Sequence, residues 1–467
     1  MSYKSSINMV ADLTDHTIAG KRIAIIGAAR SGVAAAKLLA GRGARVFVSD
    51  AAPEEKLKAQ FAELKGAGIA FEAGSHSQRV FDADLLVVSP GVPSDAQVVR
   101  DARKRGMRIV SELEIASWLC PSPIIAVTGT NGKTTTTTLI GRLLGDGRVR
   151  HAVAGNIGTA FSAVVGELDE SSYAVLEVSS FQLDDIESFH PKVSIILNIT
   201  PDHLDRYDHS FDNYIASKCR IFEHQANDDY VIYNYDDTVT RENVERRAKG
   251  RVRMIPFSAA KISGPGAFAQ SGKLFTDLGG GRSEIIATDE ISIRGVHNLY
   301  NSMAAVLAGQ ICGVSTPSIR ATLKNFKGVE HRLEFVRELK GVRYINDSKA
   351  TNVDSVWYAL QAYTQPIVLL LGGRDKGNDY ARLSDLVKKH VKAIVAIGES
   401  AEKVMNAFAS FPLVRKASSM EEAVTTASSL AASGDIVLLS PACASFDWFE
   451  NYEHRGRVFK EIVNGLS

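Results

Sequence analysis

A glycine-rich turn between residues 126 and 135 carries the clearest chemical signal in this sequence. It reads Ala-Val-Thr-Gly-Thr-Asn-Gly-Lys-Thr-Thr, an apolar run followed by a Gly/Thr turn and the start of a Thr-rich helix. Backbone N–H groups in such a turn, together with the positive end of the helix, attract a phosphate. Lys133 is expected to reach the β- and γ-phosphates, and the Thr134 hydroxyl is a ligand for Mg²⁺. The turn therefore predicts a nucleotide site rather than a loop that only caps a helix.

Two acidic segments follow apolar runs further along the chain. Glu177 ends one run, and Asp202-His203 comes just after a run that spans 194–200. Because ligands bind where strand ends gather in open α/β sheets, Glu177 and His203 are expected to converge on the phosphate turn and hold a metal ion. The alternative interpretation of His203 is that, in a polar Asp-His-x-Asp run, its side chain is solvated and binds no metal. Lys218, in an expected helix, also reads as a solvated charge from its residue type alone.

Two polar loops follow apolar runs in the last third of the chain. The first, Asn-Asp-Ser-Lys-Ala-Thr-Asn at 346–352, is suited to bind a small anion or a nucleoside, or to cap the next helix. The second, Ser-Pro-Ala-Cys-Ala-Ser-Phe-Asp at 440–447, consists mostly of small residues that would let a substrate approach the backbone. No histidine lies near Cys443 in the sequence at a position that would suggest a catalytic pair, so we do not expect this cysteine to be a nucleophile.

The elements that must position these residues form three blocks. The first opens with an apolar run at 22–27, a glycine turn at 27–32 and a helix that ends near Gly41, before a second strand reaches Asp50. This is a βαβ unit with an acidic residue about 20 positions past the turn, as in dinucleotide-binding folds. Ala29 replaces the middle glycine of G-x-G-x-x-G, so a uridine or another nucleotide fits at least as well as NAD.

The second and third blocks repeat the alternation of apolar runs and helical stretches. A Gly-rich polar segment at 263–290 predicts hairpins or exposed loops, and a helix at about 298–309 closes the second block. Apolar runs at 343–347, 366–371, 393–397 and 436–440 are the strands of the third block. The pattern predicts an α/β fold with mostly parallel sheets and helices on both faces.

Composition sets the broad class of the protein. A chain of 467 residues suggests about three domains of roughly 150 residues each. A net charge of +1 gives no reason to expect a nucleic-acid track or a membrane surface. The four cysteines are scattered, so neither a zinc site nor a disulfide framework is indicated. With no signal-peptide layout and no apolar run of about 18 residues, a cytoplasmic location is expected.

In this order, the motifs closely resemble those of the Mur ligases of bacterial cell-wall synthesis. The hallmarks are Gly129-Thr130-Asn131-Gly132-Lys133-Thr134-Thr135, Glu177-Val178-Ser179-Ser180, Asn198 with Asp202-His203-Leu204-Asp205, His297-Asn298, and Glu330-His331-Arg332. They extend from near residue 27 to near residue 455. The loops at 346–352 and 440–445 resemble those of the branch of the family that adds D-glutamate.

The resemblance implies three domains: a Rossmann-like UDP-substrate domain at 1–111, a central P-loop ATPase domain at 112–328 and a Rossmann-like amino-acid-binding domain at 329–467. It implies that ATP drives amide formation between UDP-N-acetylmuramoyl-L-alanine and D-glutamate through an acyl phosphate, in cytoplasmic peptidoglycan precursor synthesis. The expected partners are these small molecules and ATP, without nucleic acid or membrane, and the expected state is a monomer.

The resemblance also assigns roles by motif position. Lys133, Glu177, His203 and Lys218 are the expected catalytic residues. Lys218 matches a lysine that the family carbamylates with CO₂, so two Mg²⁺ ions are expected, with the ligands Thr134, Glu177, His203 and carbamylated Lys218. The expected ATP contacts are Gly129, Thr130, Asn131, Gly132, Lys133, Thr134, Thr135, Asn298, Asn301, Arg332, Asp347 and Lys349. The expected contacts to the UDP-substrate are Arg30, Ser31, Asp50, Ser89, Gly91, Asn156, Ser179 and Gln182. The expected D-glutamate contacts are Thr351, Lys376, Ser445 and Tyr452.

Three other functions compete with this one. A folylpolyglutamate synthase shares the ATPase core and a glutamate substrate, but lacks a UDP-binding first block. A nucleotide-gated switch would use the phosphate turn without an amino-acid pocket in the third block. A nicotinamide oxidoreductase would explain the first block and leave the phosphate turn without a role.

Overall fold

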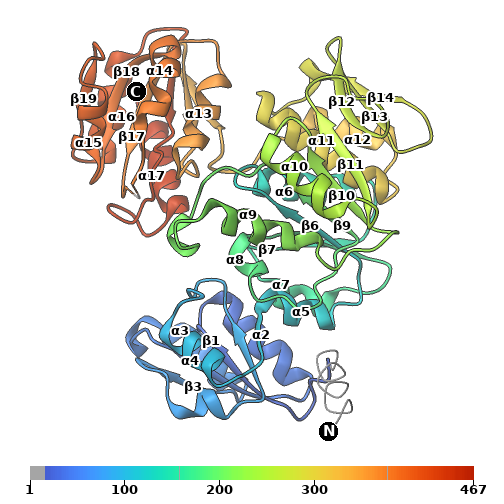
Figure 1. Ribbon diagram of the computed structural model, residues 1–467. Coiled ribbons are helices and arrows are strands. Elements are labelled where there is room, and N and C mark those ends of the chain that lie inside the picture. Colours follow the sequence, from blue (N-terminus) through green and yellow to red (C-terminus); the bar gives the residue numbers. More distant parts are fainter. Residues whose placement is uncertain (1–15, 157, 376) are drawn as a thin grey trace. The chain divides into compact units, whose positions relative to one another are not determined.

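The computed structural model describes residues 16–156, 158–375 and 377–467, which form three separate β-sheets (Figure 1). Contacts group the chain into two compact units. The first unit holds the chain up to Ile286 together with Tyr300–Thr322, and the second holds Ala287–Leu299 and Leu323–Ser467. The α/β class is confirmed, whereas domain boundaries at 111 and 328 stay predictions. Lys376, an expected D-glutamate contact, lies outside the described residues.

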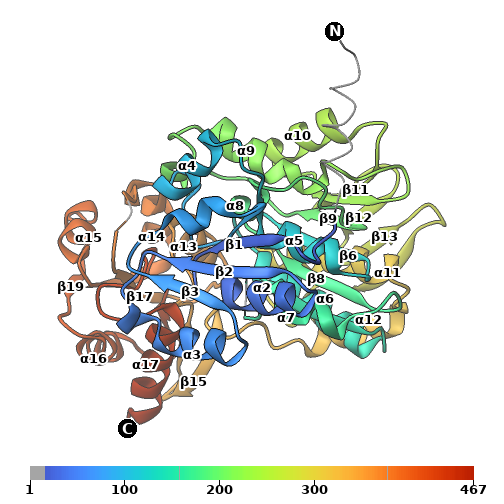
Figure 2. The same ribbon diagram turned by 90° about the horizontal axis from the view of Figure 1, so that it is seen from below.

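The first sheet has five strands in the order β3-β2-β1-β4-β5, all paired in parallel. Its strands are β1 (Arg22–Ile26), β2 (Arg45–Asp50), β3 (Ala70–Ala73), β4 (Leu85–Val88) and β5 (Ile109–Ser111). Helices α2 (Arg30–Gly41) and α3 (Lys58–Gly66) cover one face, and α4 (Gln97–Lys104) covers the other (Figure 2). This sheet buries apolar side chains on both faces, as parallel sheets do.

The second sheet has nine strands in the order β14-β13-β12-β11-β10-β9-β6-β8-β7. They are β6 (Ile124–Thr128), β7 (His151–Gly155), β8 (Tyr173–Glu177), β9 (Val193–Ile196), β10 (Tyr230–Asn234), β11 (Arg253–Ser258), β12 (Gly266–Gln270), β13 (Lys273–Asp277) and β14 (Ser283–Ala287). β12 and β13 pair in antiparallel fashion, which confirms a hairpin in the Gly-rich segment.

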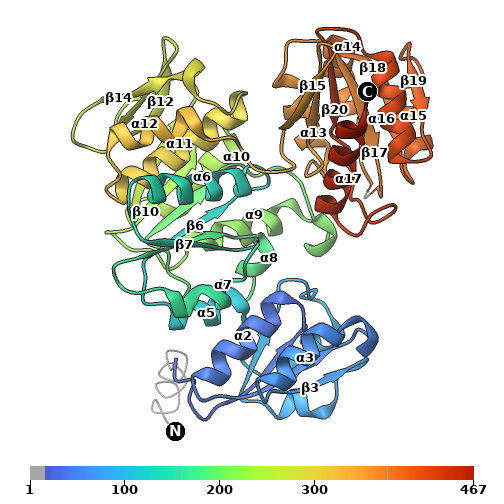
Figure 3. The same ribbon diagram turned by 180° about the vertical axis from the view of Figure 1, so that it is seen from behind.

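Helices cover the two faces of this second sheet. Apolar residues of α5 (Glu112–Leu119), α7 (Phe161–Val164), α8 (Ser180–Leu183), α9 (Phe211–Cys219) and α10 (Thr238–Ala248) share one core with the strands. Helices α6 (Lys133–Asp146) and α11 (Val296–Ile311) approach each other, since a Cβ on Gly309 would lie 3.6 Å from Leu143 Cδ1 (Figure 3). The expected closing helix is therefore confirmed as α11. Helix α12 (Thr316–Asn325) follows it.

The third sheet has six strands in the order β15-β16-β20-β17-β18-β19. They are β15 (Glu334–Leu339), β16 (Val342–Asn346), β17 (Ile367–Gly372), β18 (Val391–Ile397), β19 (Val414–Lys416) and β20 (Ile436–Leu439). Helices α13 (Val353–Gln361), α14 (Ser384–His390) and α15 (Ala401–Ala407) pack on one face, and α16 (Met420–Leu430) and α17 (Tyr452–Gly465) on the other. Only β15 runs antiparallel to its neighbour within the described sheet.

Two general features bear on function. Within the described part of the chain, no helix combines the length and apolar character needed to cross a membrane. The four cysteine thiols are free, and Cys219 and Cys443 are buried. Burial raises the pKa of every one of these thiols, to about 11 at Cys219 and about 12 at Cys312. Each is therefore protonated and poorly nucleophilic at neutral pH.

Candidate active site

The phosphate turn joins the end of β6 to the start of α6, and its two glycines are required by their geometry. Gly129 and Gly132 have φ angles of 149° and 89°, which other residues rarely adopt. A Cβ on Gly132 would lie 2.4 Å from Asn301 Oδ1, and one on Gly129 would lie 3.0 Å from Leu197 Cβ. The turn is thus packed against α11 and the end of β9, and no space is left there for a side chain at either glycine.

Asn198 holds the turn in shape through paired hydrogen bonds. Its Oδ1 accepts from Asn131 N at 2.8 Å, its Nδ2 donates to Asn131 O at 3.0 Å, and its carbonyl accepts from Thr130 N at 2.9 Å. The run at 194–200 was expected to be one strand, but β9 ends at Ile196. Leu197 N still donates to Thr128 O of β6 at 3.1 Å, but the next carbonyl, that of Asn198, accepts from Thr130 N in the phosphate turn, so the strand pairing stops there.

Lys133 and Lys218 share an acceptor in this turn. Lys133 Nζ donates to the carbonyls of Gly129 and Thr130, at 2.8 Å each, and Lys218 Nζ donates to Gly129 O at 3.0 Å. Lys218 is only 2% exposed, so its reading as a solvated charge is wrong. Burial and the adjacent Lys133 hold the pKa of Lys218 well below its usual range, against the attraction of Asp202. The amine can therefore be neutral, and a neutral amine is a nucleophile.

Tyr214, which was not among the expected site residues, connects Lys218 to the phosphate turn. It lies four residues before Lys218 on α9, and the lysine Nζ is 4.7 Å from the centre of its ring. Its hydroxyl lies 3.2 Å from Thr130 Oγ1. The i,i+4 spacing from Lys218 was the available signal, because residues four apart share one helix face.

Glu177 and Thr134 meet at the end of β8, as expected. Thr134 Oγ1 donates to Glu177 Oε2 at 2.7 Å, and Asn156 Nδ2 donates to Glu177 Oε1 at 3.1 Å. Glu177 is 2% exposed. Among the described residues, the side chains that donate hydrogen bonds to its carboxylate, Thr134 and Asn156, are neutral. A buried carboxylate without a cationic partner is costly. A hydroxyl and a carboxylate are ligands that Mg²⁺ accepts, so these residues fit a bound Mg²⁺.

His203 lies on an exposed turn ahead of a short 3₁₀ helix, Leu204–Arg206. Its side chain is 42% exposed, and its Nε2 is 3.9 Å from Asp202 Oδ2. The backbone has φ of 52°, an uncommon value for a residue other than glycine. Such a strained, exposed histidine is accessible to a ligand. A role in holding metal stays a prediction.

The expected UDP-substrate residues of the first sheet lie around its glycine turn. Asp50 Oδ2 accepts from Ala28 N at 2.6 Å, and Ser89 Oγ donates to Gly27 O at 2.9 Å. A Cβ on Gly32 would lie 1.8 Å from Gly27 O, so this last glycine lets α2 approach β1. Ser31 is half-buried and Gly91 exposed near the same strand ends.

The remaining expected substrate residues of the first unit have structural partners. Ser179 and Gln182 form a capping box that starts α8, in which Ser179 N donates to Gln182 Oε1 at 3.0 Å. Arg30 is exposed, and its guanidinium donates to Gly158 O at 3.0 Å. Asn156, the partner of Glu177, brings the loop after β7 to the metal-binding candidates.

In the second unit, Asp347 is buried at the end of β16. Its Oδ2 accepts from Ser440 Oγ at 2.7 Å, and its Oδ1 accepts from Leu333 N at 3.2 Å. Burial raises the pKa of Asp347 to about 7, although the Ser440 hydroxyl and Arg332 favour the charged form. This carboxyl can therefore take up a proton near neutral pH.

Buried Arg455 links the two polar loops at 346–352 and 440–447. Its guanidinium donates to Ser348 O at 2.7 Å, Cys443 O at 3.0 Å and Ala444 O at 3.3 Å. Arg455 was not among the expected site residues, because an arginine in an amphipathic helix is normally solvated. Only the fold places it 1% exposed between the loops.

An expected ATP contact of the first loop, Lys349, lies next to an expected D-glutamate contact, Tyr452, at the start of α17. Lys349 Nζ donates to the Tyr452 hydroxyl at 3.0 Å, and Ser348 Oγ donates to Tyr452 O at 2.8 Å. Ser445 is buried and Thr351 half-buried. The first loop and the start of α17 therefore place an expected nucleotide contact and an expected amino-acid contact side by side.

The motif His297-Asn298 lies at the start of α11, and Asn298 is an expected ATP contact. Asn298 Nδ2 donates to Arg294 O at 2.8 Å. Burial and the nearby charge of Arg332 lower the pKa of His297 to about 4. His297 is therefore neutral at pH 7.

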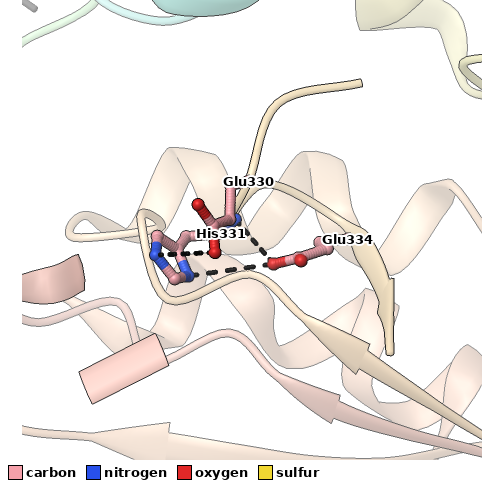
Figure 4. Close-up of side chains that lie close together, drawn as sticks. All are labelled: Glu330, His331 and Glu334. Atoms are coloured by element: carbon pink, nitrogen blue, oxygen red, sulfur yellow. Dashed lines mark hydrogen bonds and ion pairs between the residues drawn. The ribbon is translucent and has the colours of Figure 1, made fainter. Parts of the chain in front are cut away.

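Glu330, His331 and Glu334 form a second acidic cluster (Figure 4). The carboxylates already have a cationic partner, because Lys460 Nζ lies 2.8 Å from Glu330 Oε1 and 2.6 Å from Glu334 Oε1. His331 Nδ1 lies 2.9 Å from Asn346 Nδ2, which can only donate. The cluster is satisfied by protein groups, and we assign no metal to it.

Comparisons with known proteins agree with this arrangement. Family models match three consecutive segments: the Mur ligase MurD-like N-terminal domain at 21–111, the Mur ligase middle domain at 127–309 and the Mur ligase glutamate ligase domain at 331–443. Together these segments include the glycine turn of the first sheet, the phosphate turn and the Arg455-linked loop at 346–352.

Curated relatives match over almost the whole chain. UDP-N-acetylmuramoylalanine–D-glutamate ligase of Chloroherpeton thalassium is 47% identical, covering 97% of this chain and all of the relative. The enzyme of that name from Salinibacter ruber is 46% identical, again over 97% of this chain and all of the relative.

Solved structures share the fold at low identity. A UDP-N-acetylmuramate–alanine ligase from Thermotoga maritima has a TM-score of 0.59 at 19% identity, over 95% of this chain and 99% of its own. A pseudomurein peptide ligase type C from Methanothermus fervidus has a TM-score of 0.58 at 19% identity, over 96% of this chain and all of its own.

Proposed function

The chain belongs to the Mur ligase family, and on that premise we propose that it joins D-glutamate to UDP-N-acetylmuramoyl-L-alanine at the expense of ATP. The observation that carries this proposal is the 47% identity to a D-glutamate ligase over 97% of the chain. The folylpolyglutamate synthase, switch and oxidoreductase readings have no comparable support. We propose that the reaction belongs to cytoplasmic peptidoglycan precursor synthesis and that the enzyme is a monomer.

The proposed reaction replaces a poor leaving group with a good one. The alanyl carboxylate attacks the γ-phosphorus of ATP, the bond to ADP breaks, and an acyl phosphate forms. The amine of D-glutamate then attacks the acyl carbon, phosphate departs with the bonding electrons, and the amine proton passes to solvent. Since little covalent chemistry is left to the protein, its task is to position groups and to neutralise charge.

In this proposal the phosphate turn both positions the reacting groups and neutralises their charge. The N–H groups of Gly129–Thr135 and the N-terminus of α6 bind the phosphates, and Lys133 leaves its carbonyl partners to neutralise them. Thr134, Glu177 and His203 would hold Mg²⁺, which would offset the negative charge of the phosphates and the carboxylate. The buried, cation-free contact of Thr134 with Glu177 supports this assignment.

We propose that Lys218 is carbamylated and holds a second Mg²⁺. Its neutral amine attacks CO₂, a nitrogen–carbon bond forms, and a proton is released, which turns a buried cation into an anion. The lowered pKa of Lys218 and its position beside the phosphate turn support this step. The reaction would also remove the repulsion between Lys218 and Lys133.

The substrates have proposed contacts in both units. Those for the UDP-sugar are Arg30, Ser31, Asp50, Ser89, Gly91, Asn156, Ser179 and Gln182. Those for ATP in the later part of the chain are Asn298, Asn301, Arg332, Asp347 and Lys349, and those for D-glutamate are Thr351, Lys376, Ser445 and Tyr452. The link through Arg455 supports a shared site in the two loops of the second unit.

Phosphate release from ATP and Mg²⁺ tests the proposal. We expect release only when UDP-N-acetylmuramoyl-L-alanine and D-glutamate are both present, and not with L-glutamate. Release with L-alanine or a diamino acid instead would assign the chain to another branch of the family. No release with any amino acid, despite nucleotide binding, would contradict the ligase and favour the switch.

A further inference from the structure

A partly buried hydrogen-bonded cluster lies at the nucleotide edge of the first sheet, and the function above leaves it without a role. Ser49 Oγ lies 2.6 Å from Glu72 Oε1 and 2.7 Å from His76 Nδ1. Ser49 is fully buried, pairs with Ile26 on one side and Glu72 on the other, and so sits beside the glycine turn that starts at Gly27. Ligands of such sheets bind at these strand ends.

The contacts of Glu72 determine where the protons lie. Glu72 Oε1 also accepts from Ser77 N at 2.8 Å, so two donors converge on this oxygen and favour the charged carboxylate. The hydrogen bonds from Ser49 and Ser77 lower the pKa of Glu72 against the effect of burial. The single proton of the Ser49 hydroxyl must therefore point to Glu72.

The orientation of the Ser49 hydroxyl fixes the tautomer of His76. Because Ser49 donates to Glu72, its oxygen can only accept from His76, so Nδ1 carries the ring proton. Burial lowers the pKa of His76, against the attraction of Glu72 and Asp50, so the ring is neutral at pH 7. In this neutral ring Nε2 is an acceptor, and it has no hydrogen-bond partner among the described residues.

The acidic residue expected to read the nucleoside, Asp50, also holds the backbone around the glycine turn. Asp50 Oδ2 accepts from Ala28 N at 2.6 Å, and Oδ1 accepts from Ala52 N at 2.8 Å. These bonds clamp the glycine turn and the loop after β2. His76 is the neighbouring side chain whose acceptor remains open.

We propose that His76 determines nucleoside specificity, with Nε2 accepting a hydrogen bond from a donor of the bound uridine. The inference rests on the proposed function, since it takes the UDP-sugar as the ligand of this edge. Uridine offers two donors of this kind, the uracil N3–H and the ribose hydroxyls. Cytidine has an unprotonated N3, so two acceptors would face each other if N3 is the atom that is read.

Competition by nucleotides against the UDP-sugar in the phosphate-release reaction tests the proposal. For the unmodified enzyme, UDP should inhibit about tenfold more strongly than CDP if N3–H is read, or about tenfold more strongly than 2′-deoxy-UDP if the ribose is read. In His76→Ala that preference should disappear, while the KM for ATP stays unchanged. The same preference in His76→Ala as in the unmodified enzyme would overturn the proposal.

A second measurement keeps the proposal testable if His76→Ala folds poorly. Nitrogen-15 NMR of the histidine rings, assigned by loss of one signal in His76→Gln, should show the proton of His76 on Nδ1 and a shift of Nε2 when UDP binds. A proton on Nε2, or an unchanged Nε2 signal at saturating UDP, would overturn it.

His151→Ala is the matched control. His151 is also half-buried in the first unit, but it belongs to β7 and its Nδ1 lies 2.9 Å from Val149 O. Its removal should leave the preference among the nucleotides unchanged. If UDP fails to compete with the unmodified enzyme, the proposed function fails; if UDP competes but His76→Ala keeps the preference, only the present inference fails.

Discussion

Lys133 and Lys218 donate to the same atom, the carbonyl oxygen of Gly129, at 2.8 Å and 3.0 Å. Two ammonium groups on one acceptor repel each other, and this repulsion helps to lower the pKa of the buried lysine. The arrangement concentrates positive charge at the phosphate turn. A bound phosphate would attract Lys133, and loss of a proton from Lys218 would relieve the repulsion.

Removal of the Lys218 side chain should abolish ligase activity, and an added short carboxylic acid should restore part of that activity. In Lys218→Ala, ligase activity should fall by about 100-fold or more, because a metal-holding group is lost. Excess bicarbonate should not help, whereas a short carboxylic acid that fills the space should restore part of the activity. Steady-state phosphate release measures both effects.

Lys218→Arg is the control for charge alone. Arginine keeps the cation but cannot form a carbamate, so its activity should be as low as that of Lys218→Ala. Normal activity in either variant would contradict carbamylation.

A methyl group on Gly132 should prevent nucleotide binding. In Gly132→Ala the new Cβ would lie 2.4 Å from Asn301 Oδ1, at a φ of 89° that alanine adopts only with strain. The phosphate turn must then move, and the affinity for ATP should fall at least tenfold. Isothermal titration with a non-hydrolysable ATP analogue measures this loss.

The same substitution within the same helix provides the comparison. At Gly145 of α6 the nearest atom to a new Cβ is His151 Cε1 at 3.5 Å, an ordinary contact. Gly145→Ala should therefore bind ATP normally and gain up to about 1 kcal/mol in stability from its higher helix propensity. Equal ATP affinity in the two variants would contradict the steric argument.

Neutralisation of the buried carboxylate should raise the Mg²⁺ requirement. Glu177→Gln keeps the shape of the side chain and its bond to Thr134 but loses the charge, so half-maximal activity should need about 10- to 100-fold more Mg²⁺. A Mg²⁺ titration of phosphate release measures the change. Glu167→Gln, at an exposed glutamate of the same unit, should leave the titration unaltered.

Asp347 should make the second unit less stable as the pH rises. Its folded pKa of about 7 lies above the ordinary aspartate value of 3.8, so the folded state binds more protons between these two pH values. The free energy of unfolding should therefore fall across the window from about pH 4 to pH 7, by at most about 1.4 kcal/mol per pH unit from this group. Urea unfolding at pH 5 and pH 7 measures the slope.

Asp347→Asn should flatten that slope, because the side chain no longer titrates. Asp385→Asn, at an exposed carboxylate of the same unit, should keep it. A slope that Asp347→Asn does not change would assign the pH dependence to other groups.

Local chemistry made much of the fold and part of the site predictable. Apolar runs located the central strands of the sheets but not the strands β3, β7, β10, β11, β15 and β19. The phosphate turn was readable because its backbone angles at Gly129 and Gly132 favour glycine. Glu177 was also expected at a strand end, since β8 stops at that residue. These features depend on neighbours in sequence or on a single strand pairing.

Features set by distant packing could not be read from the residues. Lys218 looked like a solvated charge, and its burial follows from the meeting of α9 with the phosphate turn, 89 residues earlier in the chain at Gly129. Arg455 gives no local sign that it spans two loops, because its partners Ser348 and Cys443 come from other elements. Buried charges of this kind are recognisable only when the fold brings their partners together.

The protected thiols make the chain a favourable host for spectroscopic labels. All four native cysteines have a raised pKa, so a maleimide dye at neutral pH should react with them far more slowly than with an exposed thiol. New surface cysteines, one on each unit, would then take up donor and acceptor fluorophores with little background. Energy transfer between such a pair would measure the distance between the units in the absence and in the presence of ATP and each substrate.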